Sequence, residues 1–331
     1  MATIKDIAKR AGVAPSVVSR ALNHKYGVKK STRKLILKIA EELDYYPNAA
    51  ARSLVTRKGQ TIGIFMADIS QPYFSQIIKG MEFAANQMGY TLLFSNSFES
   101  LDHREVFKKM VESGRADGLI IVGSNNKDKN FIPFLIKREV PFVLVERNFS
   151  DPRVHCIWVD NVEGGYLATK YLIEKGHRRI GHISGNLDYQ VSLERLEGYK
   201  RALAEYQIPF SEELVAAGKF LVQDGYLAMK ELLNYKPQCT AVFVANDSMA
   251  YGALQALHES GIKVPDEIAV VGYDDLEFST LTNPSLTTVR QPRYEMGLKS
   301  VETLINILQS KTDGSIMKMC LKPELIRRFS A

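Results

Sequence analysis

The chain has 331 residues, of which 45% are hydrophobic and 24% charged, with 43 Lys and Arg against 37 Asp and Glu. No stretch approaches the roughly 18 apolar residues of a membrane span, and the N-terminal residues read as a capped helix instead of a signal peptide. Three cysteines, an odd number, argue against a disulfide framework and for reduced thiols in the cytoplasm. We expect all three thiols to be buried: Cys156, Cys239 and Cys320.

Positive charge is concentrated at the N-terminus. Residues 1–60 hold 13 Lys and Arg but only four Asp and Glu, so the rest of the chain is slightly negative. A basic head on a near-neutral body is typical of a protein that neutralises phosphates with one end. A lysine-rich solvated face would explain the charge alone, but it would not explain the helical pattern of the same segment.

The head reads as three short helices. Thr3 and Asp6 form a capping box, and the helix that they begin is expected to end at Gly12. Pro15 suits the first position of a second helix, whose exposed face is small, polar and basic and can enter the major groove, about 12 Å wide. A third helix is expected to begin at a Ser31 cap. It should contribute an apolar row to a small core: Leu35, Ile36, Ile39, Ala40 and Leu43.

The string TIKDIAKRAGVAPSVVSRALN, followed by VKKSTRKLILKIAEELDYYPNAAARSL, resembles the DNA-binding head and hinge of the LacI/GalR family of bacterial transcription regulators, in particular its ribose- and purine-repressor-like members. The resemblance runs without gaps over about the first 58 positions. It implies a hinge helix at 49–55 and a leucine, Leu54, inserted between base pairs in the minor groove. The implied DNA contacts are Thr3, Pro15, Ser16, Ser19, Arg20, Asn23, His24, Tyr45, Asn48, Ala51, Arg52 and Leu54.

Two features of the head depart from the family pattern. Ala14 stands where the family usually has Ser or Thr, so one cap or phosphate contact is missing. Pro15 and Ser16 occupy positions that usually read bases, but proline has no donor and the serine is short. We therefore expect direct readout to rest on Arg20, Asn23 and contacts with thymine methyl groups.

The predicted hinge helix should be unstable on its own. Asn48 is a good cap and three alanines favour helix, yet about two turns fall below the 12–15 residues that an isolated helix needs in water. Packing against a twofold mate and the minor groove would stabilise it. An ordinary interdomain linker is the alternative.

Beyond the hinge, apolar strand-like runs alternate with helical segments, which is the pattern of parallel sheets. A first set consists of TIGIFMA, YTLLFSN, DGLIIVG and PFVLVE, with helices at 74–88, 104–113 and 132–137. A second set consists of CIWVD, RIGHIS, AVFVAND and IAVVGYDD, with helices at 165–175, 193–206, 223–234 and 248–260. A helix at 294–309 and the run IMKMCLK should return to the first lobe. Three glycines are expected just past helix ends: Gly89, Gly176 and Gly261.

The predicted fold is an α/β core of two doubly wound parallel-sheet lobes, periplasmic-binding-protein-like, with a small all-α helix-turn-helix N-terminal domain. The motifs DNVEGG at 160–165 and GYDD at 272–275 resemble those of the same family. We expect a helix-turn-helix domain at 1–46, a hinge helix or linker at 47–58, and an effector-binding and dimerisation core at 59–331. Its lobes should be roughly 60–160 plus 291–320, and 161–290 plus the C-terminal tail.

Ligands of such sheets bind beyond the carboxyl ends of the strands. Carboxylates, guanidinium groups and aromatic rings follow several of these ends, and together they suit a sugar-like ligand. By resemblance to ribose-binding relatives, polar contacts are assigned to Glu146, Arg147, Arg195, Asp247, Asp274 and Gln291, and stacking to Tyr73, Phe74 and Phe220. The expected set also includes Asp68, Ser124, Asp160 and Asn246.

These residues have ordinary alternatives. Asp160 and Asp274 could cap loops or hinge strands, and the pair Tyr73 and Phe74 could be core aromatics. Glu146 and Arg147 could form a local ion pair.

The sequence contains no nucleophile elbow, phosphate-binding Walker loop, His-Glu-x-x-His or Cys-x-x-Cys motif, and its six histidines lack metal spacing. We therefore expect no enzyme, no cofactor and no metal. The resemblance implies a homodimeric repressor that binds a pseudo-palindromic operator and responds to a small effector, for which we expect a sugar or sugar derivative. Control by a nucleobase or by a phosphocarrier protein remains open. A solute-binding protein is a distant alternative, which the basic head disfavours.

Overall fold

The computed structural model describes residues 2–22, 26–45, 59–66, 68–96, 105, 107–123, 131–235, 237–311 and 315–331. The chain separates into two compact units, residues 1–59 and 60–331, which we call the head and the core. Several residues with predicted roles lie outside the described ranges: Asn23, His24, Asn48, Ala51, Arg52, Leu54 and Ser124.

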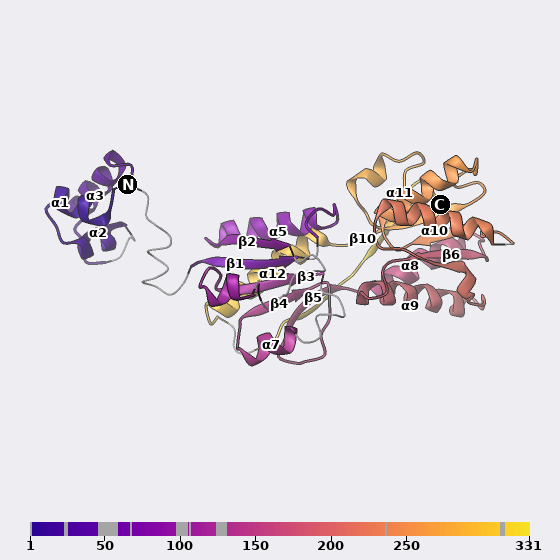
Figure 1. The fold of residues 1–331 in the computed structure, drawn as a ribbon, viewed down its shortest axis with the longest axis horizontal. Coiled ribbons are helices and arrows are strands. Elements are labelled where there is room, and N and C mark those ends of the chain that lie inside the picture. The colour runs from indigo at the N-terminus through magenta and orange to yellow at the C-terminus, as the bar shows by residue number, and fades with distance from the viewer. Residues whose placement is uncertain are drawn as a thin grey trace. The chain divides into compact units, whose positions relative to one another are not determined.

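The head contains α1 (Ile4–Ala11), α2 (Pro15–Leu22) and α3 (Lys30–Glu42), as Figure 1 shows. The capping box is confirmed, since the Thr3 backbone N–H donates to Asp6 Oδ2 at 2.8 Å and Gly12 ends α1 with φ +66°. The predicted Ser31 cap is wrong: α3 begins two residues earlier than that cap implies, so Ser31 lies inside the helix and Lys29 precedes it without a side-chain cap.

Apolar side chains from all three helices form the small core of the head. Its fully or nearly fully buried members are Ile7, Ala8, Val18, Ala21, Ile36, Ile39 and Ala40. Leu35 was expected among them but is 47% exposed, because it lies at the flank of the row on α3 that meets α1 and α2, about 100° around the helix from Ile36. A unit this small has one shared core, so each of its helices depends on the other two for stability.

The core contains two six-stranded sheets (Figure 1). The first sheet is parallel throughout, in the order β11 (Lys318–Leu321), β5 (His155–Val159), β4 (Phe142–Val145), β3 (Gly118–Val122), β1 (Thr61–Met66) and β2 (Thr91–Asn96). The second sheet runs β12 (Glu324–Ile326), β10 (Thr287–Arg290), β9 (Ala269–Asp274), β8 (Ala241–Val244), β6 (Ile180–Ser184) and β7 (Val215–Ala217), and only β12 is antiparallel to its neighbour.

Helices cover both faces of the first sheet because successive strand residues point to opposite sides. Ile64 and Ile120 pack toward α5 (Phe74–Gln87) and α12 (Arg293–Leu308), whereas Phe65 and Ile121 pack toward the opposite face. That opposite face is covered by a π-helix (Lys108–Glu112) and α7 (Phe131–Lys137). We call this sheet with its helices the first lobe.

The second sheet is covered in the same way and forms the second lobe. One face packs on α8 (Asn161–Glu174) and α9 (Gln190–Glu205), and the other on α10 (Val222–Asn234) and α11 (Asp247–Glu259). Short 3₁₀ turns occur at Glu212–Leu214 and Glu277–Thr280. The two-lobed α/β core with a helical head is the predicted fold.

The structure corrects several details of the sequence analysis. The run CIWVD was named with the second set of strands but lies within the expected bounds of the first lobe, 60–160, and β5 pairs with β4 and β11 in the first sheet. The short strands β7, β10 and β12 were not predicted, and the helix expected at 104–113 is described as a π-helix at its C-terminal end. Cys320 is exposed, although Cys156 and Cys239 are buried as expected. The three predicted glycines do follow helix ends, with φ between +71° and +98°.

The chain passes between the lobes three times: between β5 and α8, between β10 and α12, and between β11 and β12. Each lobe therefore contains segments that are distant in sequence. Residues at the crossings are close to both sheets, which places polar side chains from several elements in one region.

Candidate effector site and DNA-binding head

A chain of hydrogen bonds joins the two lobes of the core. The Tyr73 hydroxyl, at the start of α5, donates to Gln291 Oε1 at 3.3 Å, and Gln291 Nε2 donates to Asp274 Oδ1 at 2.7 Å. Gln291 lies on the crossing after β10, and Asp274 ends β9 with φ +115°. Glu146, which follows β4 with φ +70°, hydrogen-bonds to the same tyrosine hydroxyl. Strained backbone of this kind is held where a side chain must point in one direction.

Burial shapes the charges of this group. It raises the pKa of the Glu146 carboxyl to about 7 and that of Asp274 to about 6, although the Arg195 guanidinium opposes both shifts. Burial in turn lowers the pKa of Arg195, but nearby Tyr273 and Asp274 more than compensate and raise it. A carboxyl group with a raised pKa can be protonated and donate a hydrogen bond, or ionised and accept one. Glu146 and Asp274 can therefore each donate a hydrogen bond to a polar ligand or accept one from it.

Arg195 on α9 is held rigidly from three sides. Its Nε donates to Asn161 Oδ1 at 2.9 Å, its Nη1 donates to the Ala245 carbonyl at 2.7 Å, and its guanidinium carbon lies 3.9 Å from the centre of the Tyr273 ring. The Tyr273 hydroxyl also donates to Asn161 Oδ1, at 3.2 Å. A side chain fixed in this way can be aimed at a ligand without a further loss of conformational entropy.

Asn161 and Tyr273 were missed as site residues by the sequence analysis, although both lie in motifs that it singled out. The two glycines of DNVEGG explain the local packing. A Cβ on Gly164 would lie 2.1 Å from the Tyr273 hydroxyl oxygen, and one on Gly165 would lie 2.3 Å from the Arg195 carbonyl oxygen. The glycines therefore let α8 approach both residues, and this need for close approach was the available signal.

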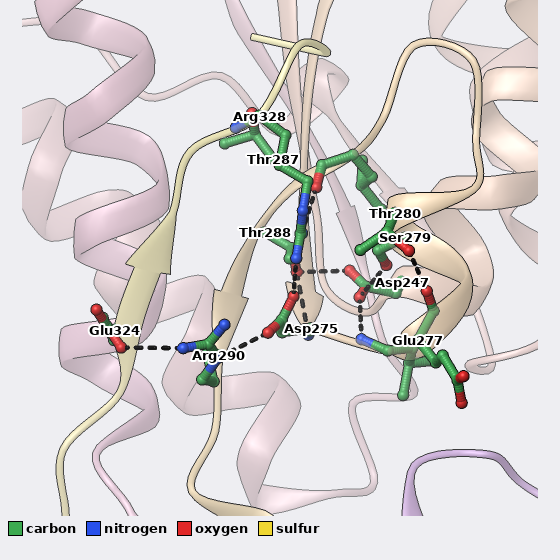
Figure 2. Close-up of polar contacts among 12 residues, drawn as sticks. Asp247, Asp275, Glu277, Ser279, Thr280, Thr287, Thr288, Arg290, Glu324 and Arg328 are labelled. Carbon is green, nitrogen blue, oxygen red and sulfur yellow. Dashed lines mark hydrogen bonds and ion pairs between the residues drawn. The ribbon is translucent and has the colours of Figure 1, made fainter.

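Asp247 has no hydrogen bond from a basic side chain among the described residues, and its contacts tie it to the frame of the second lobe. Its Oδ1 accepts from Thr288 Oγ1 at 2.6 Å, and its Oδ2 accepts from Ser279 Oγ at 2.7 Å and from the Leu276 backbone at 2.8 Å (Figure 2). Burial and then the Asp274 charge raise its pKa to about 7. These contacts connect three segments of the lobe through one buried carboxyl.

Asp275 is bonded quite differently from its neighbour in sequence. It accepts from Arg290 Nε at 2.7 Å and from Arg328 Nη2 at 2.5 Å, and Arg290 lies 3.5 Å from Glu324 (Figure 2). Its backbone carbonyl accepts from Arg293 Nη2 at 2.9 Å, while Arg293 Nη1 donates to the Tyr73 carbonyl at 3.2 Å. Arg293 thus bonds to both lobes, and it was not predicted as a site residue.

The other predicted effector residues have mainly local contacts. Asp68 accepts from both the backbone and hydroxyl of Ser70, and Asp160 caps α8 by accepting from the Glu163 backbone at 2.9 Å. Asn246 caps α11 and donates to the Phe220 carbonyl at 3.1 Å. The Arg147 guanidinium lies 5.6 Å from the Phe149 ring centre, and Phe74 packs edge-on against Tyr73 at 5.1 Å between ring centres.

The structure therefore brings together five of the predicted residues: Tyr73, Glu146, Arg195, Asp274 and Gln291. We call them the interlobe cluster. Among the described residues, no group of three or more His, Cys, Asp or Glu side chains could hold a metal ion.

In the head, the face of α2 opposite its core contacts is open. Pro15, Ser16 and Arg20 are exposed and Ser19 is half-buried, while Val18 and Ala21 face inward. Four lysines are also exposed on or next to α3: Lys29, Lys30, Lys34 and Lys38. Thr3 is exposed but engaged in the capping box, and Tyr45 packs on the head core. A basic surface beside a polar helix face suits phosphates on both sides of a groove.

Comparison with known proteins identifies separate family models for the head and for the core. Residues 3–48 match the model of the bacterial regulatory proteins of the lacI family, and residues 59–321 match that of periplasmic binding proteins and the sugar binding domain of the LacI family. The chain belongs to the LacI family. It is a DNA-binding transcriptional repressor of that family.

Individual LacI-family relatives cover nearly the whole chain. The HTH-type transcriptional repressor PurR of Proteus mirabilis (strain HI4320) is 36% identical over 332 aligned positions, covering 100% of this chain and 97% of the relative. The structure of the lac repressor dimer bound to operator and the anti-inducer ONPF is 30% identical, with a TM-score of 0.88 and coverage of 99% and 98%. The complex of the regulator CelR with cellobiose is also 30% identical, with a TM-score of 0.78 and full coverage of both chains. Among the described helices of this LacI-family chain, none is long and apolar enough to cross a membrane.

Proposed function

We propose that this repressor binds a pseudo-palindromic operator as a homodimer and is controlled by a sugar or sugar derivative bound at the interlobe cluster. The observation that carries the proposal is the hydrogen-bond chain from Tyr73 through Gln291 to Asp274, because it joins the lobes through groups that a polyol can also bond. A ligand that replaces these bonds binds one arrangement of the lobes better than another, which is the requirement for coupling to DNA binding.

Two further considerations support a sugar. Solved relatives in complex with cellobiose and, in a regulator from Enterococcus faecium, with bound ribose share the fold of this chain. The cluster also combines carboxyl, amide and guanidinium groups next to the edge-on rings of Tyr73 and Phe74, which suits hydroxyl pairs and C–H faces. Residues 1–46 would serve as the DNA-binding domain, 47–58 as a hinge, and 59–331 as the effector-binding and dimerisation core.

The effector hypothesis can be tested by isothermal titration with D-ribose, D-glucose, cellobiose and hypoxanthine. We expect one of the sugars to bind. Asp274→Ala and Arg195→Ala should each weaken the binding free energy of that sugar by about 1–3 kcal/mol, because polar groups of the ligand would lose their partners. The matched control is Glu197→Ala, an exposed residue on the same helix as Arg195. Binding of hypoxanthine alone would replace the sugar with a nucleobase, and unchanged affinity in both cluster variants would place the site elsewhere.

The DNA-binding role can be tested by the salt dependence of operator affinity. The basic head should displace condensed counterions, so log K should fall steeply with log salt concentration. Arg20→Ala should weaken operator binding by about 1–3 kcal/mol if the side chain reads a base. Lys79→Ala, an exposed lysine of the core, is the control. An equal loss on random-sequence DNA would assign Arg20 to phosphate contact only.

A further inference from the structure

Two aromatic rings meet just beyond the ends of β6 and β7 in the second lobe. The rings of Tyr189 and Phe220 lie edge to face with 5.9 Å between their centres. Gly185 directly follows β6, and Ser192 lies in the first turn of α9. We call these four residues the aromatic corner.

Ser192 differs from the other buried serines that the structure describes. Its side chain is 0% exposed, and its Oγ has no hydrogen-bond partner among the described residues. The remaining buried serines all donate from Oγ: Ser184 to the Ala216 carbonyl, Ser279 to Asp247, Ser300 to the Gly297 carbonyl and Ser330 to the Val270 carbonyl. A serine inside a helix usually bonds to the carbonyl four residues earlier, but α9 begins only at Gln190, so that route is not open to Ser192.

The unpartnered hydroxyl lies beside the ring of Phe220. A Cβ built on Gly185 would lie 2.3 Å from the Phe220 Cε1 and Cζ atoms and 2.6 Å from Ser192 Oγ, so the ring edge and the hydroxyl converge over the same glycine. Phe220 is held there with φ +71°, and its carbonyl accepts from Asn246 Nδ2 at 3.1 Å. The corner is therefore built by strained backbone and close packing, and it leaves one polar atom without a bond.

Ser192 also has a defined relation to the interlobe cluster. Arg195 lies three residues later on α9, so both side chains are on the same face of the helix. Both residues are buried, at 0% and 4% exposure. The helix thus presents a fixed guanidinium and a free hydroxyl in the same direction, with the Phe220 ring beside the hydroxyl.

We propose that Ser192 is a specificity-determining contact for the effector: its Oγ hydrogen-bonds to a hydroxyl group of a sugar ring whose C–H face lies on Phe220. This inference rests on the proposed function, because it takes the effector to be a sugar. A serine hydroxyl both donates and accepts, so it suits a ligand hydroxyl and selects against a ligand that lacks one at that position.

The test compares Ser192→Ala with Ser300→Ala in the full-length protein. Without ligand, Ser192→Ala should leave the melting temperature equal to or above that of wild type, because it removes an unpaired buried group. Ser300→Ala should lower it, because it breaks a 2.7 Å hydrogen bond. For whichever of D-ribose, D-glucose and cellobiose binds wild type, Ser192→Ala should raise the Kd roughly 5- to 100-fold, and Ser300→Ala should leave it unchanged.

The outcomes separate this inference from the proposed function. If wild type binds a sugar and Ser192→Ala binds it equally well, Ser192 is not an effector contact although the proposed function stands. If Ser192→Ala lowers the melting temperature of the unliganded protein as much as Ser300→Ala, the hydroxyl has a structural partner and the inference is wrong. If wild type binds none of the three sugars, both the proposed function and this inference are wrong.

Discussion

Asp247 offers a sharp test of the electrostatics inside the second lobe. Its carboxyl is 0% exposed and accepts three hydrogen bonds, from Thr288, Ser279 and the Leu276 backbone, but burial still raises its pKa from 3.8 to about 7. We expect Asp247→Asn to be tolerated, because an amide has nearly the same shape and the two hydroxyl partners can each accept as well as donate.

The expected magnitude follows from the pKa shift. Below pH 3.8 both folded and unfolded states hold the proton, so the shift has no effect on stability. As pH rises toward 7 the unfolded state ionises while the folded state stays protonated, and stability is lost. The full shift of Asp247 corresponds to about 4 kcal/mol, of which about 3 kcal/mol falls between pH 5 and pH 8.

Asp247→Asn should therefore gain about 3 kcal/mol relative to wild type when the pH is raised from 5 to 8. Urea unfolding followed by circular dichroism at the two pH values measures this difference. The matched control is Asp275→Asn, because hydrogen bonds from Arg328 and Arg290 outweigh burial and lower the pKa of that carboxyl. Asp275→Asn should lose stability at pH 8. Equal destabilisation of Asp247→Asn at both pH values would show that the folded state needs the charged carboxylate.

Three further substitutions probe packing and caps. Gly198→Ala should destabilise the core by about 1–3 kcal/mol in urea unfolding, because the new Cβ would lie 2.1 Å from the Val162 carbonyl oxygen; wild-type stability would mean that α8 and α9 can separate freely. Thr3→Ala should cost the head about 1 kcal/mol, seen as faster amide exchange in α1, unless Asp6 alone maintains the cap. Arg293→Ala should lower the melting temperature of the core through loss of two carbonyl contacts, about 1–3 kcal/mol, and an unchanged melting temperature would show that the lobes do not need this link.

The sequence predicted best what is encoded locally. The buried strands are continuous β-branched or aliphatic runs, and Gly89, Gly176 and Gly261 mark helix ends because few other residues tolerate positive φ. The sequence did not predict the short strands, because β7 and β12 have only three residues each, too few for a recognisable strand pattern. The lobe to which β5 belongs depends on pairing with β4 and β11, and no local feature of CIWVD records that pairing.

In the candidate site, too, the sequence predicted some residues and missed others. Tyr73, Arg195 and Asp274 were selected because of residue type and position after strands, and the structure places them together, although their role in effector binding stays a prediction. Asn161 and Arg293 act through contacts with residues distant in sequence, so residue type alone gave no signal. The feature that makes Ser192 interesting is a missing bond, which only coordinates can reveal.

The third crossing between the lobes has a consequence for the order of folding during synthesis. Residues 318–321 complete an edge of the first sheet, and residues 324–326 an edge of the second, while the Ser330 hydroxyl accepts from the Thr287 backbone and donates to the Val270 carbonyl. The head is contiguous at residues 1–59 and leaves the ribosome before the core does, so it can fold while neither sheet of the core is complete. A basic DNA-binding unit would then exist on the nascent chain before its regulatory half.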